Sequence, residues 1–287
     1  MGILIALIPA LGWGIQAIVM QKVGGKFTNK TVGMTLTTVV FGIIIFLFHR
    51  PEITASLLWG SLLSGVCWSI GQILQVKSFD LIGVSKTMPI STGEQLIVTT
   101  LLGATILGEW QHGWQFLVGL PALALIILGI TFTTIHDHTS SSDKGSNFKL
   151  GMIILAISTL GMAGYVVFPQ LFGLNGWDVA LPQSLAMLLG TVVLSLFQKD
   201  NDILGKKTLH NMLTGICFGI ANLGLLFSNQ INGVAVGFTL SQLSVIISTL
   251  GGIWILYELK SRREMRYTLI GLFLVVIGAV LIGVTKQ

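Results

Sequence analysis

The sequence has 287 residues, of which 53% are hydrophobic and only 9% are charged, whereas a soluble domain carries roughly 25% charged residues. This composition excludes a water-soluble protein and predicts an all-α integral membrane protein that has the lipid bilayer as a partner. The net charge of +5 does not indicate nucleic-acid binding, because the basic residues are distributed as a membrane topology signal. The two cysteines, Cys67 and Cys217, are too few for a disulfide framework and lack the spacing of metal ligands.

Ten apolar stretches follow one another along the chain, each close to the ~20 residues that a transmembrane helix needs. They cover residues 2–21, 32–48, 56–76, 83–107, 114–135, 150–168, 179–197, 209–228, 233–257 and 267–285. The longest connection contains the polar run TSSSDKGSN, which is typical of a flexible linker. We therefore predict a first unit of five helices over residues 1–138, a linker over 139–148 and a second unit over 149–287.

Basic residues predict the orientation of these spans. Of the 16 Lys and Arg residues, all but Arg50 and Lys286 lie in the odd-numbered connections or the adjoining helix ends. Cytoplasmic connections carry the excess of Lys and Arg in membrane proteins. The odd-numbered connections are therefore predicted to be cytoplasmic, and both termini of this multi-pass protein are predicted to be extracellular.

The second half of the chain repeats the first. The run TLLGATILGE of the fourth span recurs as TLGGIWILYE in the ninth, and near-constant offsets pair Gly12 with Gly161 and Cys67 with Cys217. Each unit contains an odd number of helices, so the second copy must insert in the opposite orientation. We predict two inverted five-helix repeats, an arrangement typical of transporters that bind substrate near the midplane between the repeats. Helices 1, 3, 4, 6, 8 and 9 are expected to line that cavity.

The first half of the fourth span is unusually polar and reads PISTGEQ. Proline lacks the backbone N–H and clashes with the preceding turn, so Pro89 followed by Gly93 predicts a local helix break. Glu94 lies eleven residues beyond Gly83, about 16 Å along a helix, and thus near the middle of a ~30 Å hydrocarbon core. An acid at this depth is costly and indicates function. We predict that Glu94 couples protons and can also bind substrate; the alternative is a permanently protonated side chain bonded to a neighbouring helix.

Tryptophan and amide side chains share helix faces in the first and third spans. Trp68, Gln72 and Gln75 follow i, i+4 and i+7 spacing, and Trp13 and Gln16 follow i and i+3 spacing. Amides both donate and accept hydrogen bonds, as hydroxyl-rich ligands require, and a Trp ring can cover the C–H face of a sugar. The alternative interpretation is hydrogen bonding between helices.

The second unit offers similar chemistry, because Asn222 aligns with Gln72, and Gln242 lies in the segment that aligns with the polar break. The predicted substrate-binding residues are Trp13, Gln16, Trp68, Gln72, Gln95, Asn222 and Gln242.

No metal and no cofactor are expected, and a proton gradient is the expected driving force for transport. Glu109 and Glu258 lie at the ends of equivalent helices. They either brace the outer and inner gates of the transporter or are ordinary solvated helix ends.

Several motifs resemble the bacterial glucose/ribose porter family of the drug/metabolite transporter superfamily. They are GVSKTMPISTGEQL, LLGATILGEW, PALGWG, SGVCWSIGQ and GFTLSQLSVIISTLGGI. The resemblance implies ten helices in two inverted repeats, a location in the bacterial cell membrane and inward sugar transport driven by protons. The ribose branch of the family is more closely resembled by the motifs LPQSLAM and KVGGK. The glucose branch is more closely resembled by the motifs STGEQL and GEW. The chain departs from the family pattern at Glu94, where an apolar residue is expected after STG.

These observations predict a secondary active transporter, not an enzyme, that imports a monosaccharide (glucose or ribose) by proton symport and alternating access. An alternative on the same fold is an exporter of amino acids or cationic compounds, with Glu94 as the cation-binding carboxylate. A membrane enzyme or sensor is a third class. Against it, the sequence contains no HExxH, Walker or GxSxG motif.

Overall fold

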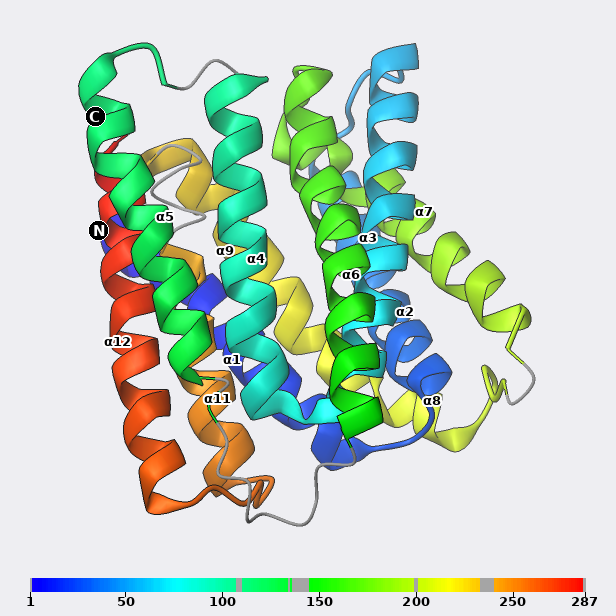
Figure 1. Cartoon of the computed structure of the whole chain (residues 1–287). Helices are drawn as coiled ribbons and strands as arrows, with labels where there is room; N and C mark the ends of the chain where they lie inside the picture. Colours follow the sequence, from blue (N-terminus) through cyan, green and yellow to red (C-terminus); the bar gives the residue numbers. More distant parts are fainter. Residues whose placement is uncertain are drawn as a thin grey trace.

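A computed structural model describes residues 2–106, 110–133, 135, 145–198, 201–232 and 240–285, and within these ranges the regular secondary structure is helical (Figure 1). The helices are α1 (Gly2–Val23), α2 (Phe27–Phe48), α3 (Ala55–Ile82), α4 (Val84–Thr105), α5 (Gly113–Thr133), α6 (Gly145–Leu171), α7 (Gly176–Leu196), α8 (Lys206–His210), α9 (Met212–Asn232), α11 (Ser244–Trp254) and α12 (Arg262–Val284). Most of the predicted linker and the start of the ninth predicted span lie outside the described residues.

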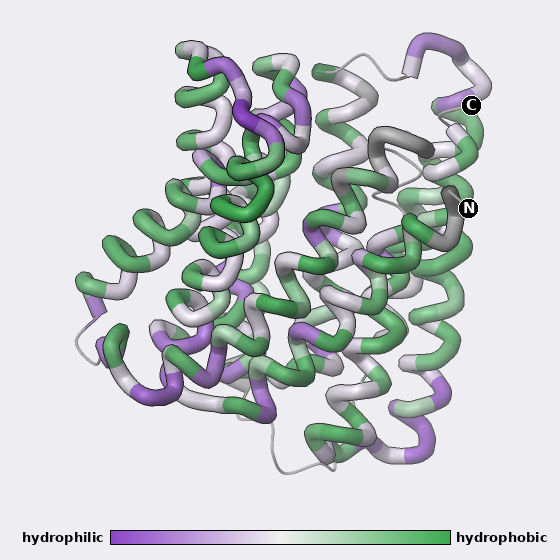
Figure 2. Tube along the Cα trace, turned by 180° about the vertical axis from the view of Figure 1, so that it is seen from behind, coloured by the Kyte–Doolittle hydropathy of each residue, from purple (hydrophilic) through white to green (hydrophobic). Residues whose placement is uncertain are grey.

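The described helices confirm an integral membrane protein. Six of them are long and apolar enough to cross a bilayer, namely α2, α3, α5, α6, α7 and α12. Figure 2 shows that hydrophobic residues predominate along the helices, whereas hydrophilic residues gather at the two ends of the bundle. The eighth predicted span is divided in the structure, because α8 ends at His210 and α9 begins at Met212.

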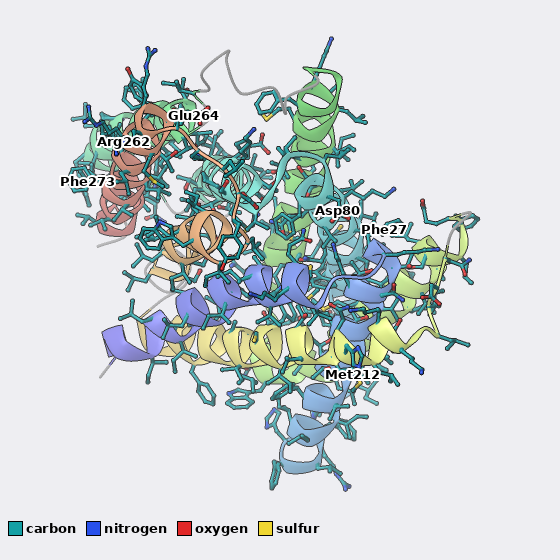
Figure 3. All side chains as sticks on the ribbon, turned by 90° about the horizontal axis from the view of Figure 1, so that it is seen from below. Phe27, Asp80, Met212, Arg262, Glu264 and Phe273 are labelled. Carbon is teal, nitrogen blue, oxygen red and sulfur yellow. The ribbon has the colours of Figure 1, made fainter. Side chains whose placement is uncertain are left out.

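Helix α2 begins five residues before the predicted span, because polar residues in its first turn are buried. Lys30, only 2% exposed, donates to Asp80 Oδ1 of α3 at 2.7 Å and to Gln21 Oε1 of α1 at 2.9 Å. Figure 3 shows Asp80 near Phe27, the first residue of α2. Lys30, which precedes the second predicted span, therefore belongs to the first turn of α2. Burial is tolerated here because the ammonium group is both paired and hydrogen-bonded.

Two helix pairs form the middle of the bundle, with α3 packed along α6 and α1 along α9. Figure 3 shows α1 and α9 side by side. Both pairs depend on a glycine. A Cβ at Gly12 of α1 would lie 2.8 Å from the Cys217 carbonyl oxygen of α9, and a Cβ at Gly161 of α6 would lie 2.6 Å from the Cys67 carbonyl oxygen of α3. The glycines and cysteines that match in the sequence therefore make matching close contacts.

The helix break predicted at Pro89 and Gly93 is not present in this structure, because α4 remains helical from Val84 to Thr105. The missing N–H of Pro89 removes a single intrahelical hydrogen bond, to the carbonyl of Ser85, and the helix continues around it. Gly93 has a packing role instead. A Cβ at this position would collide with the side chain of Ile130 of α5.

The N-terminus of α4 is held by a carboxylate from the second half of the chain. Glu258 accepts hydrogen bonds from the backbone N–H groups of Val84 at 2.7 Å and Ser85 at 2.8 Å. These N–H groups have no partner within the helix, and a negative charge is favourable at this end of the helix dipole. Glu258 is therefore not an ordinary solvated helix end, while its counterpart Glu109 lies outside the described residues.

Next to this cap, Lys260 donates to Thr268 Oγ1 at 2.6 Å. Burial, assisted by repulsion from Lys86, lowers the pKa of Lys260 to about 8, although Glu264 and Glu258 oppose the shift. In the unfolded chain this pKa returns to about 10.4. Between these two pH values the unfolded state binds the additional proton, so folding stability should rise with pH.

We predict that the thermal stability of the purified protein in detergent rises from pH 8 to 10.4 relative to that of Lys260→Met. Below pH 8 the difference between the two proteins should be constant, because Lys260 is then charged in both the folded and the unfolded state. Lys22→Met, which replaces an exposed lysine, should retain the wild-type pH profile. Parallel wild-type and Lys260→Met profiles across pH 8–10.4 would contradict the assignment.

Candidate functional site

A central cavity of about 80 Å³ lies between α1, α3, α4, α6, α9 and the segment that leads into α11. These elements correspond to helices 1, 3, 4, 6, 8 and 9 of the predicted order. Six of the seven predicted substrate-binding residues line this cavity, namely Trp13, Gln16, Trp68, Gln72, Gln95 and Gln242. The structure thus brings together residues that are separated by more than two hundred positions in the sequence.

Helical spacing explains how α3 contributes to the cavity. Trp68, Gln72, Gln75 and Phe79 all line it, because residues three or four apart share one helix face. The Trp68 ring is almost completely buried and packs at 5.1 Å, between ring centroids, against Phe218 of α9. The wall that α3 provides therefore has two amides between two aromatic rings.

Hydrogen bonds position three of the amides. Gln75 of α3 and Gln95 of α4 both donate to the Ser91 hydroxyl, each at 2.8 Å. Gln16 donates to the sulfur of Met34 at 3.1 Å, and a thioether is only a weak acceptor. The amides on α3 and α4 are thus tied to one another through Ser91.

Two other donors of the cavity have no partner. Trp13 Nε1 and Gln72 Nε2 are buried and make no hydrogen bond to the described residues. Buried polar groups are nearly always hydrogen-bonded, and leaving one unsatisfied costs about 1–3 kcal/mol. Both side chains line the central cavity. The cavity is therefore suited to a ligand that offers acceptor oxygens to an indole and an amide.

Asn222, the seventh predicted residue, lies outside the central cavity. Its Oδ1 accepts a hydrogen bond from the Tyr165 hydroxyl at 2.8 Å. Asn222 lines a second cavity of about 380 Å³ between α2, α6, α7 and α9, which we call the peripheral cavity. Tyr165 lines both cavities and stands between Asn222 and the central one. Sequence reasoning missed Tyr165, although it is the only tyrosine in the first eight predicted spans.

Glu94 is half-buried and is not among the residues that line the central cavity. Its Oε2 accepts a hydrogen bond from the Thr159 hydroxyl of α6 at 2.8 Å. The carboxyl group therefore lies where α4 packs against α6, so the structure does not show the substrate contact that the sequence suggested. Sequence analysis missed Thr159, because a single threonine in a membrane helix carries no distinctive signal.

Comparisons with known proteins find relatives over almost the whole chain. The sequence model of the family described as "Sugar transport protein" matches residues 4–285. The chain is 43% identical to "Putative sugar uptake protein lmo0169" of Listeria monocytogenes, with all of both chains covered. It is 40% identical to "Glucose uptake protein GlcU" of Bacillus subtilis, with 100% of this chain and 99% of the relative covered.

The fold is shared with a more distant protein of known structure. A crystal structure with 18% sequence identity superposes with a TM-score of 0.64, covering 98% of this chain and 95% of the other. At this identity the likeness concerns the fold alone. The match to the family and the identity to its members lead to one conclusion: the chain belongs to the sugar transport protein family, whose members are transporters and not enzymes.

Proposed function

We propose that the protein imports a monosaccharide by proton symport and alternating access. The observation that carries this proposal is the pair of unpartnered buried donors, Trp13 Nε1 and Gln72 Nε2, in a cavity lined by tryptophan and amides. Sugar hydroxyl oxygens can accept from both donors, and the Trp68 ring offers an apolar face to the C–H groups of the sugar. Glucose is the favoured substrate, because the Bacillus subtilis relative is named for glucose uptake.

The size of the central cavity supports a transporter that changes conformation. Its volume of about 80 Å³ is well below the roughly 300–1,000 Å³ of ligand-binding pockets. A monosaccharide can therefore occupy the cavity only after the surrounding helices move apart. Such movement is intrinsic to alternating access, in which one repeat moves against the other around a site near the midplane.

Inverted repeats would provide this movement. Equivalent packing supports them: α1 with α9 and α3 with α6, and also α1 with α11 and α4 with α6. In our proposal the odd-numbered connections are cytoplasmic, so that the lower end of the molecule in Figure 1 faces the cytoplasm. Both termini would then be extracellular and the protein would lie in the cell membrane.

The exporter alternative receives less support. It requires the Glu94 carboxylate to bind a cationic substrate, but Glu94 accepts from Thr159 at the α4–α6 contact and is not part of the cavity lining. The relatives compared above are also named for uptake of sugars. A neutral, hydroxyl-rich substrate matches the lining of uncharged donors and acceptors better.

Uptake into proteoliposomes tests the proposed function. Labelled glucose, ribose and an amino acid are offered with and without an inward proton gradient. We expect the gradient to drive accumulation of glucose, while the amino acid stays at the background level. Absence of sugar uptake in both conditions would refute the proposal, whereas accumulation that is independent of the gradient would refute proton symport alone.

Glu94→Gln is predicted to abolish gradient-driven accumulation and to preserve exchange of labelled for unlabelled sugar. The glutamine can still accept from Thr159, so the α4–α6 contact should persist, but it cannot bind and release a proton. Exchange requires no net proton movement and reports intact binding. Glu52→Gln, at an exposed carboxyl group between α2 and α3, is the matched control and should accumulate sugar normally. Normal accumulation by Glu94→Gln would show that this carboxyl group does not couple protons.

A further inference from the structure

The peripheral cavity is larger than the central one and lies toward the end of the bundle where α6 ends and α7 begins. Its volume of about 380 Å³ falls within the roughly 300–1,000 Å³ range of small-molecule pockets, whereas the central cavity of about 80 Å³ does not. In the proposed orientation this end of the molecule is extracellular. Of these two cavities, only the peripheral one has the size of a ligand site in the present conformation.

The peripheral cavity combines polar and aromatic groups as the central one does. Gln183, 7% exposed, donates its Nε2 to the Ser64 hydroxyl at 2.7 Å. This bond fixes the amide and leaves Oε1 as an acceptor. The buried Ser184 hydroxyl donates to the Leu181 carbonyl oxygen at 2.8 Å and keeps its acceptor capacity. The rings of Phe41 and Tyr165 supply apolar surface.

Tyr165 and its hydrogen bond to Asn222 lie where the two cavities adjoin. Tyr165 of α6 lines both cavities, and its hydroxyl donates to Asn222 of α9, which lines the peripheral cavity. A sugar hydroxyl can accept from the tyrosine or donate to the Asn222 Oδ1, so a sugar can replace either side of this bond. A ligand in the peripheral cavity can thus compete for a hydrogen bond of Tyr165, which also lines the central cavity.

From these contacts we propose that the peripheral cavity is a second monosaccharide site, which receives the sugar from outside before it passes Tyr165 and Asn222 to the central cavity. This inference rests on the proposed function and orientation. It adds a site that binds glucose independently of Gln72, with Gln183 and Asn222 as the amides that contact the sugar.

Protection of an introduced cysteine tests the second site. Ala180 lines the peripheral cavity, and Ala180→Cys is made in a chain in which Cys67 and Cys217 are replaced by alanine. The rate of modification by a membrane-impermeant methanethiosulfonate is measured in proteoliposomes with and without glucose. We expect glucose to slow modification at least fivefold, both with Gln72 intact and with Gln72→Leu. Adding Gln183→Leu should raise the glucose concentration for half-protection at least tenfold, whereas Ser195→Ala should not change it.

Two outcomes would overturn the inference. If Gln72→Leu abolishes protection, the effect arises from central binding and the peripheral cavity is not an independent site. If glucose does not slow modification even with Gln72 intact, the cavity does not bind glucose. Labelled glucose uptake by the Ala180→Cys chain is measured in parallel. Uptake by this chain without protection refutes the second site alone, while absence of uptake by the wild-type protein refutes the proposed function. Glu52→Cys, on an exposed connection, should react at the same rate with and without glucose.

Discussion

Gln72→Leu is expected to weaken glucose binding roughly 10- to 100-fold, the equivalent of losing about 1.5–3 kcal/mol of hydrogen bonding to the ligand. The same substitution should leave the unliganded protein as stable as the wild type or more stable. Gln72 Nε2 is buried without a partner among the described residues, so an apolar side chain removes an unsatisfied donor from the folded state. Equilibrium binding of labelled glucose and thermal unfolding in detergent, without sugar, measure the two effects.

The opposite signs distinguish a ligand-binding amide from a structural one. If Gln72 only stabilised the bundle, its replacement would lower stability, and binding would fall as a consequence. Ser195→Ala is the matched control. The Ser195 hydroxyl is also buried and has no partner in the described part of the chain, but it does not line the central or the peripheral cavity. Its removal should leave glucose affinity unchanged. Unchanged affinity in Gln72→Leu would remove the amide from the site.

Gly161→Val is expected to destabilise the protein by at least the 1–3 kcal/mol that is typical of an overpacked core. A Cβ at this position would lie 2.6 Å from the Cys67 carbonyl oxygen and 2.8 Å from the Gly71 backbone nitrogen of α3. Both are backbone atoms, so no side-chain rotation can relieve the overlap. The α3 and α6 helices would have to separate along the wall of the central cavity, and sugar binding should weaken together with stability.

Unfolding of the variant in detergent measures this effect, and the chain provides two comparisons. Gly12→Val should be similarly destabilising, because Gly12 makes the matching contact with Cys217 of α9. Gly113→Ala should have little effect, because a Cβ there would meet no atom within 4 Å. If Gly161→Val unfolds at the wild-type temperature, the close approach of α3 and α6 is not required.

Six of the predicted spans coincide with helices long and apolar enough to cross a membrane, but their ends differ from the prediction. Hydropathy registers side-chain polarity, so the second span was predicted to begin at residue 32, beyond Asn29 and Lys30. The helix begins at Phe27, because the Lys30 ammonium group is paired with Asp80 and hydrogen-bonded to Gln21. A polar helix end can be buried when other elements supply its partners, and hydropathy contains no information on those partners.

The fourth helix shows the same limit within the site. Gln95 lines the central cavity, whereas its neighbour Glu94 contacts Thr159 of α6. Successive residues of an α-helix, with 3.6 residues per turn, point about 100° apart. Depth in the bilayer follows from counting residues, and it places both side chains near the midplane. Which of the two faces the cavity depends on the rotation of α4 against α6, and packing determines that rotation.

By itself, the sequence determined the membrane class, the positions of the apolar spans, the family and six residues of the central cavity, because hydropathy, helical spacing and repeated motifs are properties of the linear chain. Tertiary structure alone decided that Glu258 caps α4, that Lys30 pairs with Asp80 and that Tyr165 separates Asn222 from the central cavity. Each of these contacts joins residues at least 50 positions apart. Such partners are selected by the relative rotation and register of packed helices, which a linear pattern does not specify.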